Sequence, residues 1–262
     1  MEPPPIVLVV ALSQEQRALR RVLDCSRRIG ATKFPLFRGE LGRRPVLLLQ
    51  AGVGRTRVCR ALLETARLFS YRAAWSLGFA GGLVEDLRPG TLVVPSSVFD
   101  TDRLAPRPLP AGSDPEGVRT ALASAGIVVC GGMLLSVNAP LQTPESKRAA
   151  HHRLGAVAVD MEAAGVAETA ERLGIPWLAI KAIVDPVGEA LPEHLLHCTT
   201  CEGDLAWRGV LWNLTSGRRR AALFRLGRAS RRAALALGHG LRAAMAGGYL
   251  DAGLSPPVGW EK

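Results

Sequence analysis

The tetrapeptide Val159-Asp160-Met161-Glu162, with the apolar run at residues 177–184 and the Asp185-Pro186 that follows it, decides the fold of this chain. A short apolar run ends at Asp160, a segment of helical period follows, and the second apolar run leads directly into Asp185. In a parallel α/β sheet such a β-α-β stretch delivers the carboxyl ends of its strands to one crevice, where ligands bind. We therefore expect Glu162 and Asp185 to lie at the same mouth of the sheet.

Two acidic residues at such a mouth indicate chemistry, because a carboxylate is costly to bury unless it is paired, hydrogen-bonded or protonated. An ionised carboxylate can bind sugar hydroxyls, and a protonated one can donate a proton. The pair therefore predicts a sugar-binding group beside a proton donor. The alternative for Asp185-Pro186 is an ordinary turn that ends a strand.

Outward from this stretch, apolar runs rich in β-branched residues alternate with helix-period segments, which predicts an α/β fold with a central mixed β-sheet flanked by helices. The expected strands are residues 6–11, 46–51, 73–79, 91–98 and two runs within 127–137; the expected helices are 13–23, 55–69 and 160–173. Ser13 and Gln16 predict a capping box at the first helix. Residues 100–115, rich in Pro, Asp and Gly, predict a loop or lid.

The composition changes after Pro192, which divides the chain into an α/β domain (1–192) and a basic helical C-terminal extension (193–262), packed on or appended to the core. From Leu205 to Leu250 there is no acidic residue but there are nine arginines: 208, 218, 219, 220, 225, 228, 231, 232 and 242. An apolar stripe recurs at roughly helical spacing: Leu223, Leu226, Ala233, Leu237 and Leu241. Three glycines (227, 238 and 240) argue against one unbroken helix.

A basic helix with an apolar stripe is typical of a segment that lies on a membrane surface. The alternative is a helix that packs its stripe on the core and leaves its arginines in solvent. The chain as a whole carries a formal charge of +10, and only four of its 33 basic residues are lysines. Because this bias towards Arg reflects overall composition as much as an anionic partner, we expect no nucleic-acid binding.

Composition also bounds the location of the protein. Hydrophobic residues make up 48% of the 262, which is enough for a core. The five cysteines (25, 59, 130, 198 and 201) are odd in number and mostly lie in apolar runs, as is typical of the reducing cytoplasm. The first apolar run, residues 6–12, is too short to span a bilayer, and no signal peptide is expected. We expect a cytoplasmic protein, with peripheral contact at the inner membrane face through the basic extension.

Four segments stand in order along the chain: Ala11-Leu12-Ser13-Gln14-Glu15, Gly78-Phe79-Ala80-Gly81-Gly82-Leu83, Val159-Asp160-Met161-Glu162-Ala163-Ala164 and Lys181-Ala182-Ile183-Val184-Asp185. Together they resemble the nucleoside phosphorylase and nucleosidase superfamily, especially the nucleosidases acting on methylthioadenosine and S-adenosylhomocysteine. Within it the chain is most similar to the hopanoid-associated phosphorylases. That similarity rests on the Val-Asp-Met-Glu form of the third motif, on Leu191-Pro192 after Asp185-Pro186, and on the Arg-rich tail.

The resemblance implies roles for the acidic residues. Asp185 matches the general acid that donates to N7 of the purine, which requires an apolar site to raise its pKa. Glu162 matches the glutamate that binds both ribose hydroxyls, and Met161 the methionine that packs against the sugar. Glu15 aligns with the glutamate that activates water in the hydrolytic members. The alternatives are an ordinary core methionine for Met161 and a carboxylate favoured by the helix dipole for Glu15. Asp160 has helix capping as its expected role.

The glycine turn implies the site of the base. Gly78, Phe79, Ala80 and Gly81 are expected to bring backbone amides close to the ligand. Leu141 lies where the family grips the adenine edge, and Phe79 or Trp177 is expected to stack on the base.

The residues around the glycine turn also predict whether water or phosphate accepts the ribosyl group. Phosphorolytic relatives place an Arg before the glycine turn and a Ser within it, whereas this chain has Ser76 and Phe79 there. The pattern favours water, unless Arg17, Arg55 or Arg57 supplies a cation for phosphate.

The resemblance therefore implies an enzyme that cleaves the N-glycosidic bond of a 5′-substituted adenosine, with adenosylhopane as the favoured substrate. The rivals are a nucleosidase for methylthioadenosine or another small nucleoside, and a non-catalytic nucleoside- or nucleic-acid-binding protein that keeps the fold. No cofactor is expected, phosphate being the alternative co-substrate to water. The expected partners are a small or lipid-linked nucleoside and a second copy of the chain in a homo-oligomer.

One further cluster consists of metal-capable side chains close together in sequence: His194, His197, Cys198 and Cys201. A tetrahedral zinc site normally draws ligand pairs from separated segments, because one short stretch rarely wraps the ion. We therefore expect no metal, and an exposed loop after the catalytic strand.

Overall fold

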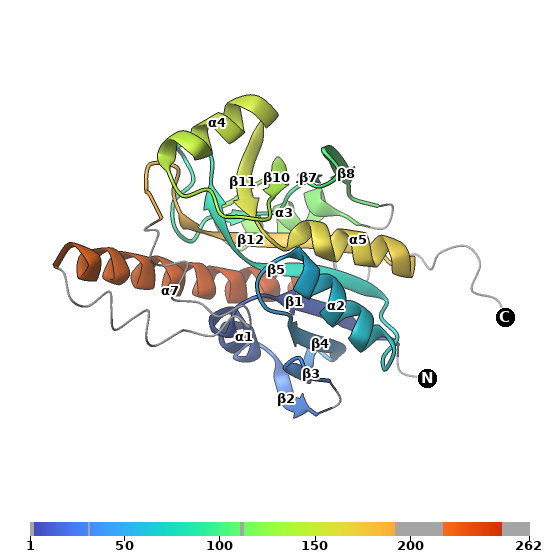
Figure 1. Ribbon diagram of the computed structural model, residues 1–262. Helices are drawn as coiled ribbons and strands as arrows, with labels where there is room; N and C mark the ends of the chain where they lie inside the picture. Colours follow the sequence, from blue (N-terminus) through green and yellow to red (C-terminus); the bar gives the residue numbers. More distant parts are fainter. Residues whose placement is uncertain (1–2, 31, 111–112, 192–216, 248–262) are drawn as a thin grey trace.

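The strands form one mixed sheet in the computed structural model, which describes residues 3–30, 32–110, 113–191 and 217–247 (Figure 1). The first six strands are β1 (Ile6–Val10), β2 (Asp24–Ile29), β3 (Leu36–Leu41), β4 (Arg44–Gln50), β5 (Ala73–Gly82) and β6 (Leu92–Val93). The other six are β7 (Ser97–Asp100), β8 (Ala105–Pro108), β9 (Val129–Cys130), β10 (Met133–Ser136), β11 (Ala156–Asp160) and β12 (Trp177–Asp185). The helices are α1 (Ser13–Arg20), α2 (Arg55–Ala66), α3 (Pro115–Ser124), α4 (Pro144–Leu154), α5 (Ala163–Leu173) and α7 (Gly217–Ala246).

Strand β5 is the centre of the sheet. Its first half pairs in parallel with β1, its length pairs in parallel with β12, and its last residues pair antiparallel with β11. The described strands continue in the order β2-β3-β4-β1-β5-β11-β10-β7-β8, while β6 and β9 extend the sheet beyond β12. The predicted mixed sheet flanked by helices is confirmed.

The helices cover both faces of this sheet, because the strand sequences bury both of their sides. In β1 the alternate residues Ile6, Leu8 and Val10 join the apolar cluster beneath α1, α3 and α7. Val7 and Val9 point the other way, into the cluster beneath α2 and α5. Two-sided burial explains why the strands read as continuous apolar runs rather than as alternating ones. Helix α4 lies apart, against β11 (Figure 1).

Helix α7 is part of the core. Its residues Ala233, Leu237 and Leu241 are fully buried in the cluster that also holds α1 and β12. From Leu226 onwards the apolar stripe of α7 therefore packs on the sheet and is not free to enter a lipid surface. Five arginines on the solvent side of α7 are exposed: Arg225, Arg228, Arg231, Arg232 and Arg242. No helix in the described parts of the chain is long and apolar enough to cross a membrane.

The glycines of α7 do not break it, contrary to the sequence expectation. A Cβ on Gly240 would lie 2.4 Å from Leu92 Cδ1, and one on Gly238 would lie 3.3 Å from Val22 Cγ1. Glycine is therefore used at these two positions so that the helix can approach the sheet and α1 closely. The helical propensity lost, about 1 kcal/mol per glycine, is offset by that packing.

Several predicted elements differ from the observed ones. The expected strand at 91–98 is two strands, β6 and β7, because Pro95 lies between them and cannot donate to a ladder. The expected loop at 100–115 contains β8, which pairs with β7. Strand β2 carries mostly exposed polar residues at the sheet edge and has no apolar pattern that the sequence could reveal.

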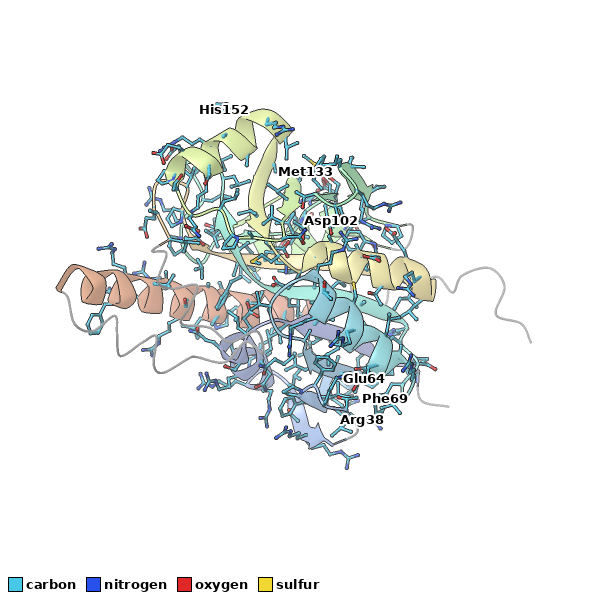
Figure 2. All side chains as sticks on the ribbon, viewed as in Figure 1. Arg38, Glu64, Phe69, Asp102, Met133 and His152 are labelled. Carbon is cyan, nitrogen blue, oxygen red and sulfur yellow. The ribbon has the colours of Figure 1, made fainter. Side chains whose placement is uncertain are left out.

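A surface hollow of about 290 Å³ lies near the chain start, lined by residues that include Pro5, Arg38 and Phe69. Arg38 and Phe69 are near the foot of the molecule in Figure 2, far from Asp102 and Met133. The hollow lies where β1 begins, and ligands of open α/β sheets bind where strands end. We therefore look for the functional site at the opposite end of β1.

Candidate active site

The glycine turn at the end of β5 is where the predicted site residues meet. In the hydrogen-bonding register Gly81 stands opposite Val159 of β11 on one edge and opposite Asp185 of β12 on the other. Strand β11 runs antiparallel to β5, so the expectation of a parallel β-α-β unit is wrong for this pair. Glu162 and Asp185 nevertheless come to the same place, because both strands end beside Gly81.

Asp185 packs directly against this turn. A Cβ on Gly81 would lie 3.0 Å from Asp185 Oδ2, so only glycine leaves room for the carboxyl group. Asp185 is 7% exposed, and burial raises its pKa above the usual range, while the nearby Lys147 ammonium limits the rise. Its Oδ2 atom lies 2.6 Å from Lys147 Nζ. A buried carboxyl group with a raised pKa can hold a proton on its other oxygen and donate it to a ligand.

Glu15 is held by the backbone of two strand ends. Its Oε2 accepts from the N–H groups of Ala11 (3.0 Å) and Leu12 (2.8 Å), and its Oε1 accepts from Phe79 N–H (2.7 Å). A Cβ on Gly78 would lie 2.9 Å from Oε1, which explains the glycine there. Burial raises the pKa of Glu15, although these three N–H groups and Lys181 oppose the rise. The carboxyl group is thereby fixed at the turn.

The start of α1 differs from the capping box expected there. Ser13 is the first helical residue, and no side chain of the cap residue accepts a backbone N–H. Glu15 rather than Gln16 accepts from Leu12 N–H, so the capping carboxylate of the helix is also a predicted site residue.

Glu162 lies between β11 and the first turn of α2. Its Oε1 accepts from Gly54 N–H at 2.9 Å, and Oε2 lies 3.4 Å from Met161 N. Burial raises the pKa of Glu162 to about 7, with a further contribution from the Asp160 carboxylate and opposition from Lys181. The group is therefore poised to be ionised at or above neutral pH, when it could accept from two hydroxyls of a sugar.

Lys181 is a member of the site that the sequence interpretation missed. Its Nζ lies 2.8 Å from Asp160 Oδ2, and both side chains are almost fully buried. Burial disfavours the ammonium form, but Asp160 and then Glu162 outweigh it, so the pKa of Lys181 is raised. A lysine inside the apolar run of β12 was the available signal, because such a cation must find an acid. Asp160 Oδ2 also accepts from the N–H of Ala163, the first residue of α5, at 2.9 Å, a contact of the kind expected from a capping carboxylate.

The apolar residues of the predicted site divide into two groups. Met161 and Leu141 are part-buried and pack on one cluster with Leu83 and Val159, beside the turn. Phe79 is part-buried, and its neighbour Ala80 is buried.

Trp177 does not belong to this site, because it begins β12 whereas Asp185 ends it. Eight steps of about 3.3 Å separate the two by roughly 26 Å. Of the two rings considered for stacking on the base, only Phe79 is near the turn.

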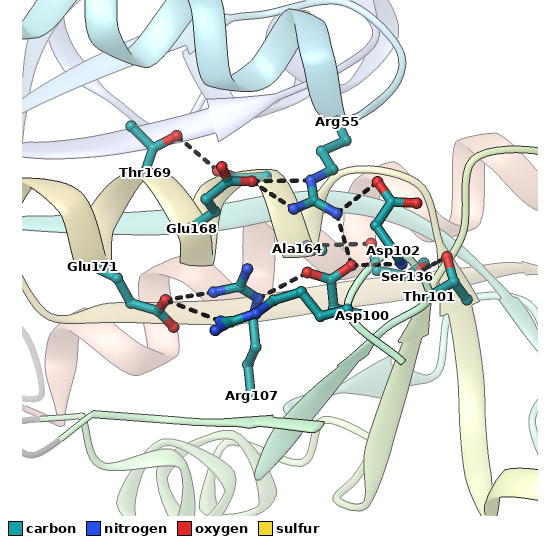
Figure 3. A network of polar contacts seen from close by, with 12 residues as sticks. Arg55, Asp100, Thr101, Asp102, Arg107, Ser136, Ala164, Glu168, Thr169 and Glu171 are labelled. Carbon is teal, nitrogen blue, oxygen red and sulfur yellow. Dashed lines mark hydrogen bonds and ion pairs between the residues drawn. The ribbon is translucent and has the colours of Figure 1, made fainter. Parts of the chain in front are cut away.

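Arg55, one of the arginines considered for phosphate, is already engaged by acids (Figure 3). Its guanidinium lies 2.7 Å from both Asp100 Oδ1 and Asp102 Oδ2 and 2.6 Å from Glu168 Oε2. Arg107 donates to Asp100 Oδ2 (2.9 Å) and pairs with Glu171. We call these residues the Arg55–Arg107 network. It anchors the start of α2, where Gly54 N–H is aimed at Glu162.

The other two arginines also have local partners. Arg17 donates to Ser13 O at 3.2 Å, and Arg57 donates to Ala51 O at 3.3 Å. No group of three or more potential metal ligands occurs in the described ranges. The cluster of His194, His197, Cys198 and Cys201 lies outside them.

Comparisons with known proteins identify the family and support the fold. The 5′-methylthioadenosine/S-adenosylhomocysteine nucleosidase of Mycobacterium bovis is 27% identical, over 69% of this chain and 85% of that protein. The crystal structure of the Neisseria meningitidis nucleosidase of the same name has a TM-score of 0.70 at 19% identity, covering 93% of this chain and 99% of that one. Futalosine hydrolase of Helicobacter pylori has a TM-score of 0.71 at 16% identity, with coverages of 93% and 97%. The model of the Phosphorylase superfamily matches residues 5–222. The chain therefore belongs to the Phosphorylase superfamily.

Proposed function

We propose that this protein cleaves the N-glycosidic bond of a 5′-substituted adenosine and releases adenine. The observation that carries the proposal is the convergence of Glu15, Glu162 and Asp185 on the turn at Gly78–Gly82, each with a raised pKa. Raised pKa values gathered at the ends of neighbouring strands are typical of a functional site.

In the proposed reaction Asp185 is the general acid. The glycosidic bond breaks with its electron pair moving to the adenine, and the Asp185 proton passes to N7 of the departing base. Ionised Glu162 accepts from the 2′- and 3′-hydroxyls, orients the ribose and stabilises the positive charge that develops at C1′. Met161 and Leu141 supply apolar surface beside the sugar and the base, and Phe79 stacks on the base.

Water is the proposed acceptor, with Glu15 as the group that activates it. The three arginines considered for phosphate have other partners, and Phe79 occupies the position of the phosphate-binding Ser of phosphorolytic relatives. The reaction needs no cofactor, since carboxyl groups carry both proton steps.

Adenosylhopane is the substrate we favour, on the resemblance of the Val159–Glu162 motif, Leu191-Pro192 and the basic tail to the hopanoid-associated phosphorylases. A second candidate, methylthioadenosine or S-adenosylhomocysteine, is favoured by the names of the relatives that match. The rival of another class is a protein that binds nucleosides without cleaving them.

Measurement of free adenine separates these possibilities. We expect adenine to be released faster from adenosylhopane than from methylthioadenosine, and at the same rate with and without phosphate. The sugar product should be a 5′-substituted ribose that carries a hydroxyl group rather than a phosphate at C1′. Release that depends wholly on phosphate would overturn the choice of water. Tight nucleoside binding with no adenine released from any substrate would favour the non-catalytic rival.

We also propose two contacts beyond the active site. The first is a second copy of the chain closing the 5′ side of the pocket, for which sedimentation should give a dimer. The second is binding to an anionic bilayer through the exposed arginines of α7, since the stripe residues Ala233, Leu237 and Leu241 are buried in the core. Each Arg contributes about 1 kcal/mol near such a surface.

Truncation of α7 would remove core residues, so charge variants are the appropriate test of bilayer binding. Replacing Arg225, Arg228, Arg231 and Arg232 by Gln should release the folded protein from anionic liposomes. Unchanged co-sedimentation would contradict the membrane proposal.

A further inference from the structure

Lys147 is a fully buried cation that the proposed mechanism does not use. It lies in the first turns of α4, which begins at Pro144, and its side chain is 0% exposed. Its Nζ lies 2.6 Å from Asp185 Oδ2 and donates to Pro186 O and Glu189 O, each at 2.9 Å. A lysine ammonium has three donors and strong hydration, so its burial requires such partners.

The use of lysine at this position is itself informative. The chain has 33 basic residues but only four lysines, and two of them, Lys147 and Lys181, are buried against acids of the site. A compact ammonium fits where a planar guanidinium with five donors would not. Lysine is therefore kept where a point charge must lie close to a carboxyl group.

We infer that Lys147 is a positioning residue for the proposed reaction: it holds the Asp185 carboxyl group against the glycine turn and stabilises the carboxylate left after proton donation. This inference rests on the proposed role of Asp185. When the proton passes to N7 of the base, a negative charge appears on a carboxyl group that is 7% exposed. The adjacent ammonium supplies the opposite charge there, and solvent returns the proton after the adenine leaves.

The geometry supports Lys147 as the positioning residue and Asp185 as the proton donor. The two carbonyl contacts fix the ammonium and, with it, the segment after β12, which Leu191 N–H also ties to Gln142 O at 2.8 Å. The third donor of the ammonium faces Asp185 Oδ2 at 2.6 Å, so Oδ1 is the oxygen that would carry the proton to a ligand. The charged side chains that act on Asp185 are Lys147 and the exposed Glu189, with opposite signs. Lys147 is the closer and the buried one.

Removal of the ammonium should weaken Asp185 as an acid. An opposite charge within 4–6 Å typically lowers a carboxyl pKa by about 1–3 units. In Lys147→Met the alkaline limb of the pH profile of kcat/KM should therefore move up by at least about one pH unit, and kcat at neutral pH should fall about tenfold, a part of what general acids contribute. Arg148→Met, one residue along α4 at an exposed ion pair with Glu85, is the matched control and should change neither quantity.

A second measurement does not depend on activity or on the folding of the Lys147 variant. With lysine labelled at Cε, only four NMR signals are expected. The Lys147 signal should titrate with the pKa of Asp185 in the wild-type protein and should not do so in Asp185→Asn. A Lys147 signal unaffected by Asp185→Asn, or Lys147→Met with an unmoved alkaline limb and full turnover, would overturn the inference.

The two measurements also separate this inference from the proposed function. If no nucleoside is cleaved, the function fails while the NMR titration still tests the coupling of the two side chains. In the Asp185→Asn background, Lys147→Met should have no further effect on residual turnover. An additive loss would show that Lys147 acts through the fold alone and would contradict its role through Asp185.

Discussion

The active-site acids and the Arg55–Arg107 network are two clusters of charged side chains at neighbouring places on one sheet, and their carboxyl groups behave in opposite ways. Asp100 is 1% exposed, yet the donors of Arg107 and Arg55 overcome its burial and hold its pKa below the usual range. Asp185 is 7% exposed with one ammonium beside it, and its pKa is raised. The surroundings of the same residue type therefore favour its ionised form in one cluster and its protonated form in the other.

The difference lies in the charge of the donors beside each carboxyl group, since the three donors of Glu15 are neutral backbone N–H groups. Asp100 receives two guanidinium groups and the N–H of Asp102, so ionisation is favoured and the cluster stabilises the fold. That stability is present above the usual pKa near 3.8 and is lost as the pH falls through the lowered value. The active-site acids Glu15 and Glu162 give the opposite pH dependence of stability. Their protonated forms suit the folded state, and stability is lost as the pH rises through their raised pKa values.

The largest expected effect is a loss of stability when the Arg55–Arg107 network is broken. Arg107→Met should lower the free energy of unfolding by about 3–5 kcal/mol, because it removes the more deeply buried of the two guanidinium groups that compensate the buried Asp100 carboxylate. Arg103→Met is the control, since Arg103 is exposed and lies 3.8 Å from the same Glu171. Urea unfolding measures both. Equal, small losses in the two variants would show that burial does not distinguish the network from a surface ion pair.

Next is the acid of the active site. Asp185→Asn should keep the fold and nucleoside binding but lower turnover on the order of 10²-fold or more, equivalent to about 2.7 kcal/mol or more in the barrier. Asp86→Asn, at an exposed position, should leave turnover unchanged. Adenine release and circular dichroism provide the measurements. Wild-type turnover in a folded Asp185→Asn protein would remove this residue from the mechanism.

Glu162 tests the sign of the pH dependence. Since burial and Asp160 raise its pKa from 4.5 to about 7, the wild-type protein should lose stability on the order of 2 kcal/mol between pH 5 and 8 through this group. Glu162→Gln should lose less over that range and be the more stable protein at pH 8. Its kcat/KM should fall, because the ribose contact is lost. If the free energy of unfolding changes equally between pH 5 and pH 8 in the wild-type protein and in Glu162→Gln, the pKa of Glu162 is not raised.

The smallest expected effect concerns the glycine turn. In Gly81→Ala the added Cβ would meet Asp185 Oδ2 at 3.0 Å and Val159 Cγ1 at 3.2 Å, so the carboxyl group must shift by a few tenths of an ångström. We expect turnover to fall roughly tenfold or less, as displaced catalytic groups lose effectiveness steeply. Gly188→Ala, where nothing lies within 4 Å of the new atom, is the control. Equal kinetics of the two variants would mean that the turn does not fix Asp185.

Sequence reasoning reached the acids but not their cations. Glu15, Glu162 and Asp185 stand at the ends of apolar runs, and local pattern is enough to place them at one end of a sheet. Lys147 and Lys181 act through contacts 38 and 21 residues away along the chain, to Asp185 and Asp160, and no periodicity encodes such a pairing. The antiparallel direction of β11 was also beyond local pattern, because it depends on which edge of β5 is free after β1 ends.

The packing of α7 also has a consequence for how the chain matures. The ribosome makes all twelve strands that the structure describes before it makes this helix, and α7 ends 61 residues after Asp185. Because synthesis proceeds at about 5–20 residues per second, several seconds pass before α7 can pack on its face of β5, β6 and β12. The nascent sheet would expose Leu92, Ile180 and Ala182 during that interval. Chaperone capture and aggregation should therefore be concentrated in nascent chains between the emergence of β12 and that of α7.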